Sequence, residues 1–188
     1  MKKSDIDKEL KDVMGDFLPN DYDVPMGEGN YMRLEEGENK FRVLQKPILG
    51  WELWIGKKPK RYEMGKSIPV EDADSADLDE RTGEPRMAKH FWAMVVYNYD
   101  LDKVQVLELT QKTILRTIRG LAKSKDWGSP LNYDLSVVKS GKGFETSYDT
   151  IPSPPKPLSE EVSKAWKEAE DKIDIEVLFE AEDPFAKV

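Results

Sequence analysis

The sequence predicts an all-β fold with one short helix, a five-stranded barrel that carries an acidic extension at each end. Between residues 89 and 148 the spacing of apolar residues changes from alternation to a helical period and back, which predicts strand, strand, helix, strand, strand. A further alternating run, residues 40–55, precedes that block. No apolar run approaches the roughly 18 residues that a membrane-spanning helix needs, so no membrane association is expected.

The first strand is expected over residues 40–55, with a kink at Pro47 and Gly50. Glycine inside a long strand often marks a sharp bend at a barrel corner. The second strand, residues 89–99, is rich in aromatic and β-branched residues, which fit a pleated, half-buried surface. A third strand, residues 103–110, follows after a short turn.

Apolar residues at helical spacing then predict a helix over residues 114–122. After a breaker at residues 127–130, alternation returns at 133–138, and a glycine-rich turn at 140–143 leads into residues 144–148, which close a hairpin. The predicted order β-β-β-α-β-β is that of the OB-fold, a small five-stranded Greek-key barrel that binds oligonucleotides and oligosaccharides.

Charge is unevenly distributed along this chain of net charge −8. Residues 31–66 carry nine Lys/Arg against five Asp/Glu, and residues 89–157 carry ten against seven. The reverse holds for residues 1–30 (four against eight), 67–88 (two against seven) and 158–188 (four against ten). The predicted barrel is therefore basic and its appendages are acidic, and this asymmetry is more informative than the total charge.

These boundaries divide the chain into an acidic N-terminal extension (1–30), an OB-fold domain (31–157) with a long loop at 56–88, and a C-terminal helix with an acidic tail (158–188). Ser159 is expected to cap the C-terminal helix. The apolar face of that helix either packs on the barrel or awaits a partner, and it comprises Val162, Trp166, Ala169 and Ile173.

Several chemistries are excluded by composition. The chain has no cysteine, and its one histidine is His90, so disulfides and zinc sites of ordinary His/Cys composition are excluded. Phosphate-binding glycine loops, a nucleophile elbow and an HExxH metal motif are absent, and the carboxylates lie in solvated runs. We therefore expect neither a cofactor nor enzymatic activity.

Within the 56–88 loop, residues 56–66 are basic around Tyr62, whereas residues 71–80 are acidic. Cations meet phosphates and rings stack on bases, so this pattern suits an unpaired nucleic-acid strand; a solvated loop is the alternative, and for any single ring the alternative is core packing. The candidate nucleic-acid-binding residues are Arg42, Trp51, Trp54, Lys57, Lys58, Lys60, Arg61, Tyr62, Lys89, Trp92, Tyr97, Tyr99, Lys139 and Lys142.

Six segments, taken in order, resemble bacteriophage single-stranded-DNA-binding proteins, which have an OB-fold core. They are residues 29–34, 37–44, 50–54, 89–96, 106–112 and 127–158. The order of elements is also similar to that of the T4-type helix-destabilising protein. The zinc module in the loop after that protein's first strand has no counterpart here, since residues 56–88 contain neither Cys nor His. Its basic N-terminal arm also differs from the acidic residues 1–30.

The resemblance implies sequence-nonspecific binding of single-stranded DNA during phage replication or recombination, in the cytoplasm of a bacterial host. It also implies that the acidic tail recruits partner proteins, because Asp-Pro-Phe at 183–185 is similar to the tail ending of bacterial single-stranded-DNA-binding proteins. The candidate partner-binding residues are Leu178, Phe179, Asp183 and Phe185. We expect the proline-rich segment 151–158 to hold this tail away from the barrel, so that truncation after Pro157 leaves the barrel folded.

Two other functions remain open. A non-enzymatic protein- or carbohydrate-binding module on the same barrel, such as a phage adaptor, would also use exposed rings, but it would not need a basic barrel. A DNA-mimicking inhibitor would fit the overall charge of −8, but the basic barrel weighs against it.

Overall fold

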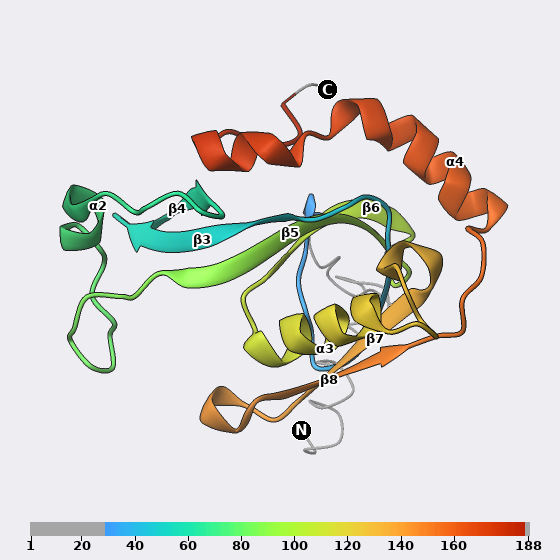
Figure 1. The fold of residues 1–188 in the computed structure, drawn as a ribbon, viewed down its shortest axis with the longest axis horizontal. Helices are drawn as coiled ribbons and strands as arrows, with labels where there is room; N and C mark the ends of the chain where they lie inside the picture. Colours follow the sequence, from blue (N-terminus) through green and yellow to red (C-terminus); the bar gives the residue numbers. More distant parts are fainter. Residues whose placement is uncertain (1–28, 187–188) are drawn as a thin grey trace, which may run out of the picture.

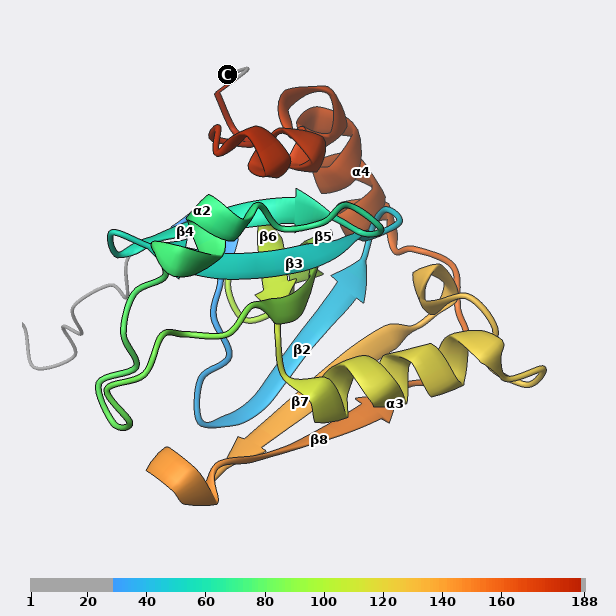
Figure 2. The ribbon, with the colours of Figure 1, turned by 60° about the vertical axis from the view of Figure 1, so that its left-hand side comes forward.

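The structure is a computed structural model that describes residues 29–186 of the chain. These residues form mostly β-sheet with a few short helices, which is consistent with an all-β, OB-like fold (Figures 1 and 2). Nearly all of the expected N-terminal extension lies outside the described residues. No helix within residues 29–186 is long and apolar enough to span a bilayer.

The strands are β1 (Tyr31–Met32), β2 (Gly37–Val43), β3 (Ile48–Ile55), β4 (Lys58–Glu63), β5 (Lys89–Asn98), β6 (Lys103–Leu109), β7 (Asp134–Ser140) and β8 (Ser147–Pro152). The α-helices are α2 (Val70–Asp74), α3 (Lys112–Lys123) and α4 (Glu160–Ala169). The 3-10 helices are η1 (Pro130–Asn132), η2 (Gly143–Glu145), η3 (Glu170–Lys172) and η4 (Ile175–Glu180).

The strands make one sheet of eight, in the order β1-β6-β5-β2-β7-β8, with β3 pairing on β5 and β4 pairing on β3. The expected first strand is thus two strands separated near Pro47, and both pair antiparallel with β5: β2 near Asn98 and β3 near Lys89. Within residues 29–186 no pairing joins β8 back to β1 or β6, so the sheet does not close. With eight strands in an open sheet, the expected five-stranded Greek-key barrel is not confirmed.

The last hairpin lies further along the chain than expected. Residues 143–145 form a 3-10 turn, and β8 begins only at Ser147. Gly141 and Gly143 have positive φ, and a Cβ at Gly141 would collide with the Glu145 carbonyl oxygen. The glycine-rich segment therefore makes a wider turn than a two-residue hairpin loop, and this turn displaces the strand.

The segment 56–88 is not a structureless loop, which corrects the expectation from sequence. It contains β4, which forms a hairpin with β3, then α2 and an isolated bridge between Leu78 and Pro85. Gly56 and Lys57 both have positive φ, at 60° and 62°, as a two-residue type I′ turn requires. A lysine in this position and Pro59 within the strand conceal the hairpin in the sequence, and Pro59 is tolerated because β4 is an edge strand.

One hydrophobic core lies between the sheet and α3. The apolar side of α3, expected from the sequence, buries Ile114, Leu115 and Ile118. The strand residues packed with them are Met32, Phe41, Val43, Met94, Val96, Leu107, Leu109, Leu135 and Val137. This core therefore buries one of the two apolar faces of β5, through Met94 and Val96.

The other apolar face of β5 is covered by the C-terminal segment, residues 159–186. Phe91, Ala93 and Val95 pack with Ile175 and Leu178 in a second core. Trp166 and Ile173 also pack against it, and α4 and η4 lie on the side of the sheet opposite α3 (Figure 1). Ser159 caps α4 as expected, since its Oγ accepts a hydrogen bond from the Val162 N–H at 3.3 Å.

The expectation that the acidic tail is held away from the barrel is therefore wrong. Leu178 is 2% exposed. The Phe179 ring lies 6.1 Å from the Phe91 ring, and the Phe185 ring lies 6.0 Å edge-on from Tyr31. The outer face of β5 is as apolar as its inner face, so covering it with the tail removes apolar surface from water.

Candidate nucleic-acid interface

The strand register sorts the expected binding residues onto two faces of the β4–β3–β5 sheet. Trp51 pairs with Tyr62 on one side and with His90 on the other, and Leu49 pairs with Trp92. Paired residues share a face, and successive side chains alternate between faces. One side, here called the hairpin face, therefore carries Leu49, Trp51, Leu53, Ile55, Lys58, Lys60, Tyr62, His90 and Trp92.

Three rings on the hairpin face form a connected row. The Trp51 and His90 rings lie 5.3 Å apart at 57°. Trp92 Nε1 donates a hydrogen bond to His90 Nε2 at 3.1 Å, and His90 Nδ1 lies 2.8 Å from the Gly50 carbonyl oxygen. Both contacts fit one neutral tautomer with the proton on Nδ1, so the imidazole is held between two partners. All three rings are half-buried, which leaves part of each accessible for stacking.

His90 was not among the residues expected to bind. On the sequence alone, a single histidine on a strand is more often structural. The signal that identifies it is its position two residues before Trp92, which places both rings on the same side of β5.

The acidic half of the 56–88 segment folds against the basic half. Asp72, in α2, accepts hydrogen bonds from Lys60 Nζ at 2.6 Å and from the Tyr62 hydroxyl at 2.8 Å. Burial raises the pKa of Tyr62 to about 12, with a further contribution from Asp72, so the phenol remains a donor. The hydrogen bonds from Lys60 and Tyr62 lower the pKa of Asp72.

A second carboxylate from this segment occupies the β3–β4 turn. Asp77 accepts hydrogen bonds from the backbone N–H groups of Gly56 and Lys57, each at 2.7 Å. The side chains of Lys57 and Lys58 are exposed beside it. Asp72 and Asp77 therefore occupy donors that are suited to the oxygens of a phosphate.

Three of the expected residues point to the opposite face, where they have partners within the protein. Arg61 Nη2 lies 2.7 Å from Glu108 and 3.4 Å from Glu52, and the Arg61 side chain is 9% exposed. Trp54 Nε1 donates to Glu52 at 3.0 Å, and Tyr97 is buried. Burial corrects the expectation that Arg61 and Tyr97 meet a ligand at the surface. Trp54 is half-buried and lies on the face opposite Trp51.

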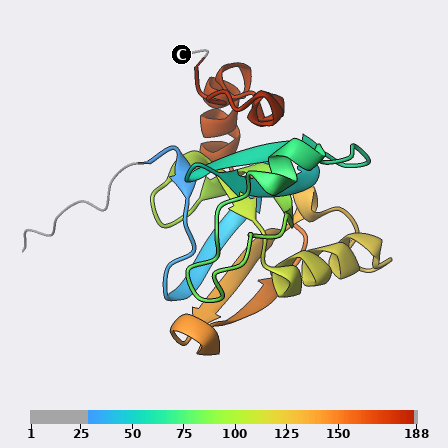
Figure 3. The same cartoon turned by 90° about the vertical axis from the view of Figure 1, so that its left-hand side faces the viewer.

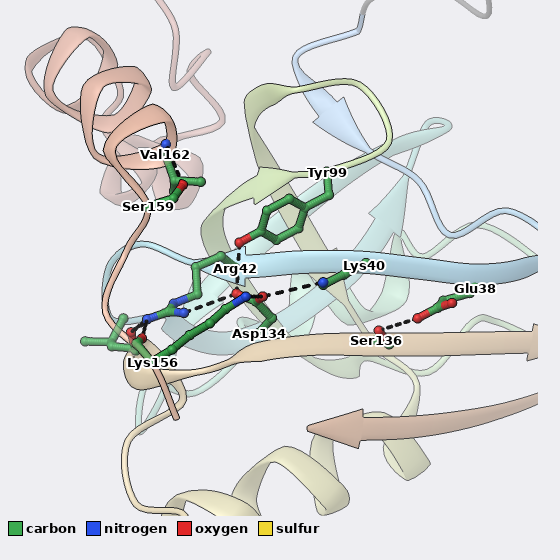
Figure 4. Close-up of polar contacts among 10 residues, drawn as sticks. Glu38, Lys40, Arg42, Tyr99, Asp134, Ser136, Lys156, Ser159 and Val162 are labelled. Carbon is green, nitrogen blue, oxygen red and sulfur yellow. Dashed lines mark hydrogen bonds and ion pairs between the residues drawn. The ribbon is translucent and has the colours of Figure 1, made fainter. Parts of the chain in front are cut away.

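Arg42 is another correction, because it is 2% exposed and lies within the end of the sheet. Its Nη1 donates to Asp134 at 3.1 Å, Nε and Nη2 donate to the Leu131 carbonyl, and Nη2 also donates to the Lys156 carbonyl at 2.8 Å (Figure 4). The Tyr99 hydroxyl donates to the same Asp134 at 2.9 Å. Arg42 thus joins β2 to the start of β7 and to the proline-rich segment, and Tyr99 joins the end of β5 to the same carboxylate.

The last three expected cations lie apart from the ring row. Lys139, on β7, donates to the Leu34 carbonyl at 2.9 Å, and Lys142 is exposed in the turn after β7. Lys89 is exposed at the start of β5 and faces away from the hairpin face. Among residues 29–186 no cluster of His, Cys, Asp or Glu is arranged to hold a metal ion.

Comparison with known proteins gives one distant likeness. No protein-family model matches the chain, and no solved structure matches it. A curated protein of Escherichia phage T5, named a probable ssDNA-binding protein, is 24% identical over 138 residues, which cover 63% of this chain and 53% of that protein. The chain therefore spans about half the length of this phage protein.

Proposed function

We propose that this chain binds single-stranded DNA without sequence preference and acts as a non-enzymatic protein in phage replication or recombination, inside the host cell. The observation that carries the proposal is the row of Trp51, His90 and Trp92, flanked by Lys58 and Lys60 on one sheet face. The name of the phage T5 protein supports the same ligand class. The concentration of basic residues in the sheet domain of an acidic chain supports it further.

The hairpin face offers both interactions that bind single-stranded DNA, namely base stacking and phosphate neutralisation. Half-buried rings are platforms for bases, and each stacked base contributes roughly 1–3 kcal/mol whatever its identity. The ammonium groups of Lys57, Lys58 and Lys60 supply phosphate neutralisation, which is independent of sequence. In this proposal a phosphate replaces the carboxylate of Asp72 at Lys60, and another replaces Asp77 at the amides of the turn.

We infer further that the architecture is an opened OB barrel. The long bent pair β2–β3 takes the place of the first strand, and β5, β6, α3, β7 and β8 follow in the order expected for that fold. The adjacency β6-β5-β2-β7-β8 supports this assignment. Strands β1 and β4 are additions to the five.

We also propose that the C-terminal segment recruits replication or recombination proteins. Leu178 is buried, and Phe179 and Phe185 pack on the protein's own rings, so these apolar side chains are not offered to a partner in this conformation. The surface presented instead is acidic. Its exposed carboxylates after η3 are those of Glu176, Glu180, Glu182 and Asp183.

The proposal predicts tighter binding of oligo-dT than of duplex DNA of equal length, with quenching of tryptophan fluorescence. The logarithm of the affinity should fall with the logarithm of salt concentration, with a slope of roughly −0.7 for each phosphate neutralised. Fluorescence titration at several salt concentrations measures both quantities. A sugar- or protein-binding module would show little salt dependence, and no detectable oligo-dT binding at low salt would refute the proposal.

A matched pair of tryptophans tests the face that is used. Trp51→Ala should weaken oligo-dT binding roughly tenfold or more, because a base loses its stacking partner. Trp54→Ala, three residues along the same strand but on the opposite face, should leave affinity near wild type. Melting temperatures of both variants separate a binding defect from a folding defect. Equal losses of affinity in the two variants would exclude the hairpin face as the stacking surface.

A further inference from the structure

Helix α3 carries a basic stripe along its exposed side. Positions four, three and four residues apart share one face of a helix with 3.6 residues per turn. The stripe, all of it exposed, consists of Lys112, Arg116, Arg119 and Lys123. Ile114, Leu115 and Ile118 occupy the buried side of the helix, so the stripe is separate from the core contact.

The charge of this stripe is not neutralised by the protein. The twelve residues of α3 include no Asp or Glu, and none of the four basic side chains makes an ion pair or hydrogen bond within residues 29–186. By contrast, some cations of the sheet are paired, as Lys60 is with Asp72 and Arg61 is with Glu108. In a chain of net charge −8, four adjacent unpaired cations form a surface that favours a polyanion.

The stripe begins beside one end of the ring row. Trp92 pairs with Leu109, the last residue of β6, and α3 starts three residues later at Lys112. Trp92 and Ile114 also pack in the same core. From there α3 runs along the side of the sheet opposite α4, away from the β3–β4 hairpin (Figures 1 and 3). The first turn of α3 is therefore the basic part of the helix that lies nearest to Trp92 along the chain and in the core.

We propose that the α3 stripe is a second phosphate-binding surface. It binds the phosphates of a single-stranded DNA whose neighbouring bases stack on the hairpin face. This inference rests on the proposed function and extends its footprint. From Lys112 to Lys123 the stripe runs about 16 Å, at 1.5 Å per residue, which is long enough for several phosphates. The residues beside the stripe have small side chains and are exposed: Thr113, Thr117 and Gly120. A Cβ at Gly120 would meet nothing within 4 Å, so the surface there is open.

The test compares oligo-dT of about 6 nucleotides, which covers one surface, with oligo-dT of about 20 nucleotides, which covers both. The variant is Arg116→Gln, Arg119→Gln and Lys123→Gln, because glutamine retains helix propensity. The matched control is Lys164→Gln, Lys167→Gln and Lys172→Gln, which removes the same charge from α4 and η3 on the other side of the sheet.

The α3 variant should bind the short oligonucleotide like wild type and bind the long one roughly tenfold more weakly at low salt, with a salt slope shallower by up to about 2. The control variant should match wild type on both. A charge-preserving variant, Arg116→Lys with Arg119→Lys, should retain affinity for the long oligonucleotide and shows that charge rather than folding is responsible.

Equal affinity of the α3 variant and the control variant for the long oligonucleotide would overturn the inference while leaving the hairpin face intact. If the α3 variant instead loses only the binding of poly-glutamate, the stripe serves an acidic peptide and the single-strand assignment is wrong. Failure of wild type to bind either oligonucleotide refutes the proposed function itself, and the inference with it.

Discussion

Truncation after Pro157 should unfold the protein or make it aggregate. The removed segment buries Val162, Ile175 and Leu178, each at most 3% exposed. Ile175 and Leu178 pack against the outer side of β5. Each fully buried aliphatic side chain contributes about 1.5–3 kcal/mol, and the truncation also exposes the sheet face beneath. Since a domain is stable by about 5–15 kcal/mol, this loss removes most of its stability.

Circular dichroism melting and size-exclusion chromatography of the truncated chain measure this effect. A milder variant, Leu178→Ala, should lower the free energy of unfolding by about 2–5 kcal/mol while retaining the fold. Glu180→Ala, an exposed position two residues away, is the control and should change it by less than about 0.5 kcal/mol. A truncated protein that melts as the full chain does would show that the second core contributes little.

Asp134→Asn should lower the free energy of unfolding by about 3–5 kcal/mol, the range for breaking a buried ion pair by removing one partner. The change leaves the Arg42 guanidinium, 2% exposed, without its counter-charge and weakens the hydrogen bond from the Tyr99 hydroxyl. Lys156→Gln is the matched comparison, because its ammonium lies 2.9 Å from the same carboxylate but its side chain is 52% exposed. Exposed pairs contribute about 0–1 kcal/mol, so this second variant should be much milder in urea denaturation.

The same carboxylate predicts an acid dependence. Burial alone would raise the pKa of Asp134, but Lys156, Tyr99 and Arg42 outweigh burial and hold that pKa below the ordinary value of 3.8. A carboxyl whose pKa is lowered by folding stabilises the native state above its unfolded pKa, and this contribution is lost as the pH falls through the folded pKa. Between pH 6 and pH 3 the urea midpoint of the wild type should therefore fall more than that of Asp134→Asn. Parallel curves would contradict this assignment.

Part of the candidate site was accessible to sequence reasoning and part was not. The concentration of cations and rings near Trp51 and Tyr62 is a local property of the chain, so the residue types alone predicted it. Whether a given residue faces the ligand or the interior depends on pairing with other strands, so the sequence could not separate Trp51 from Trp54. Nor could it show that Asp72 and Asp77 bind the same hairpin, since these contacts join residues 10 to 21 positions apart.

The sequence by itself determined the order of β5, β6, α3 and β7, because hydrophobic periodicity is a local consequence of strand and helix geometry. Only the tertiary structure decided what covers each side of β5, since both sides are apolar and alternation assigns neither to the interior. It likewise decided the role of Arg42, whose partner Asp134 lies 92 residues away. A cation in an alternating strand has the same local pattern whether it binds a phosphate or a buried carboxylate, and the fold selects between them by desolvating the arginine beside its partner.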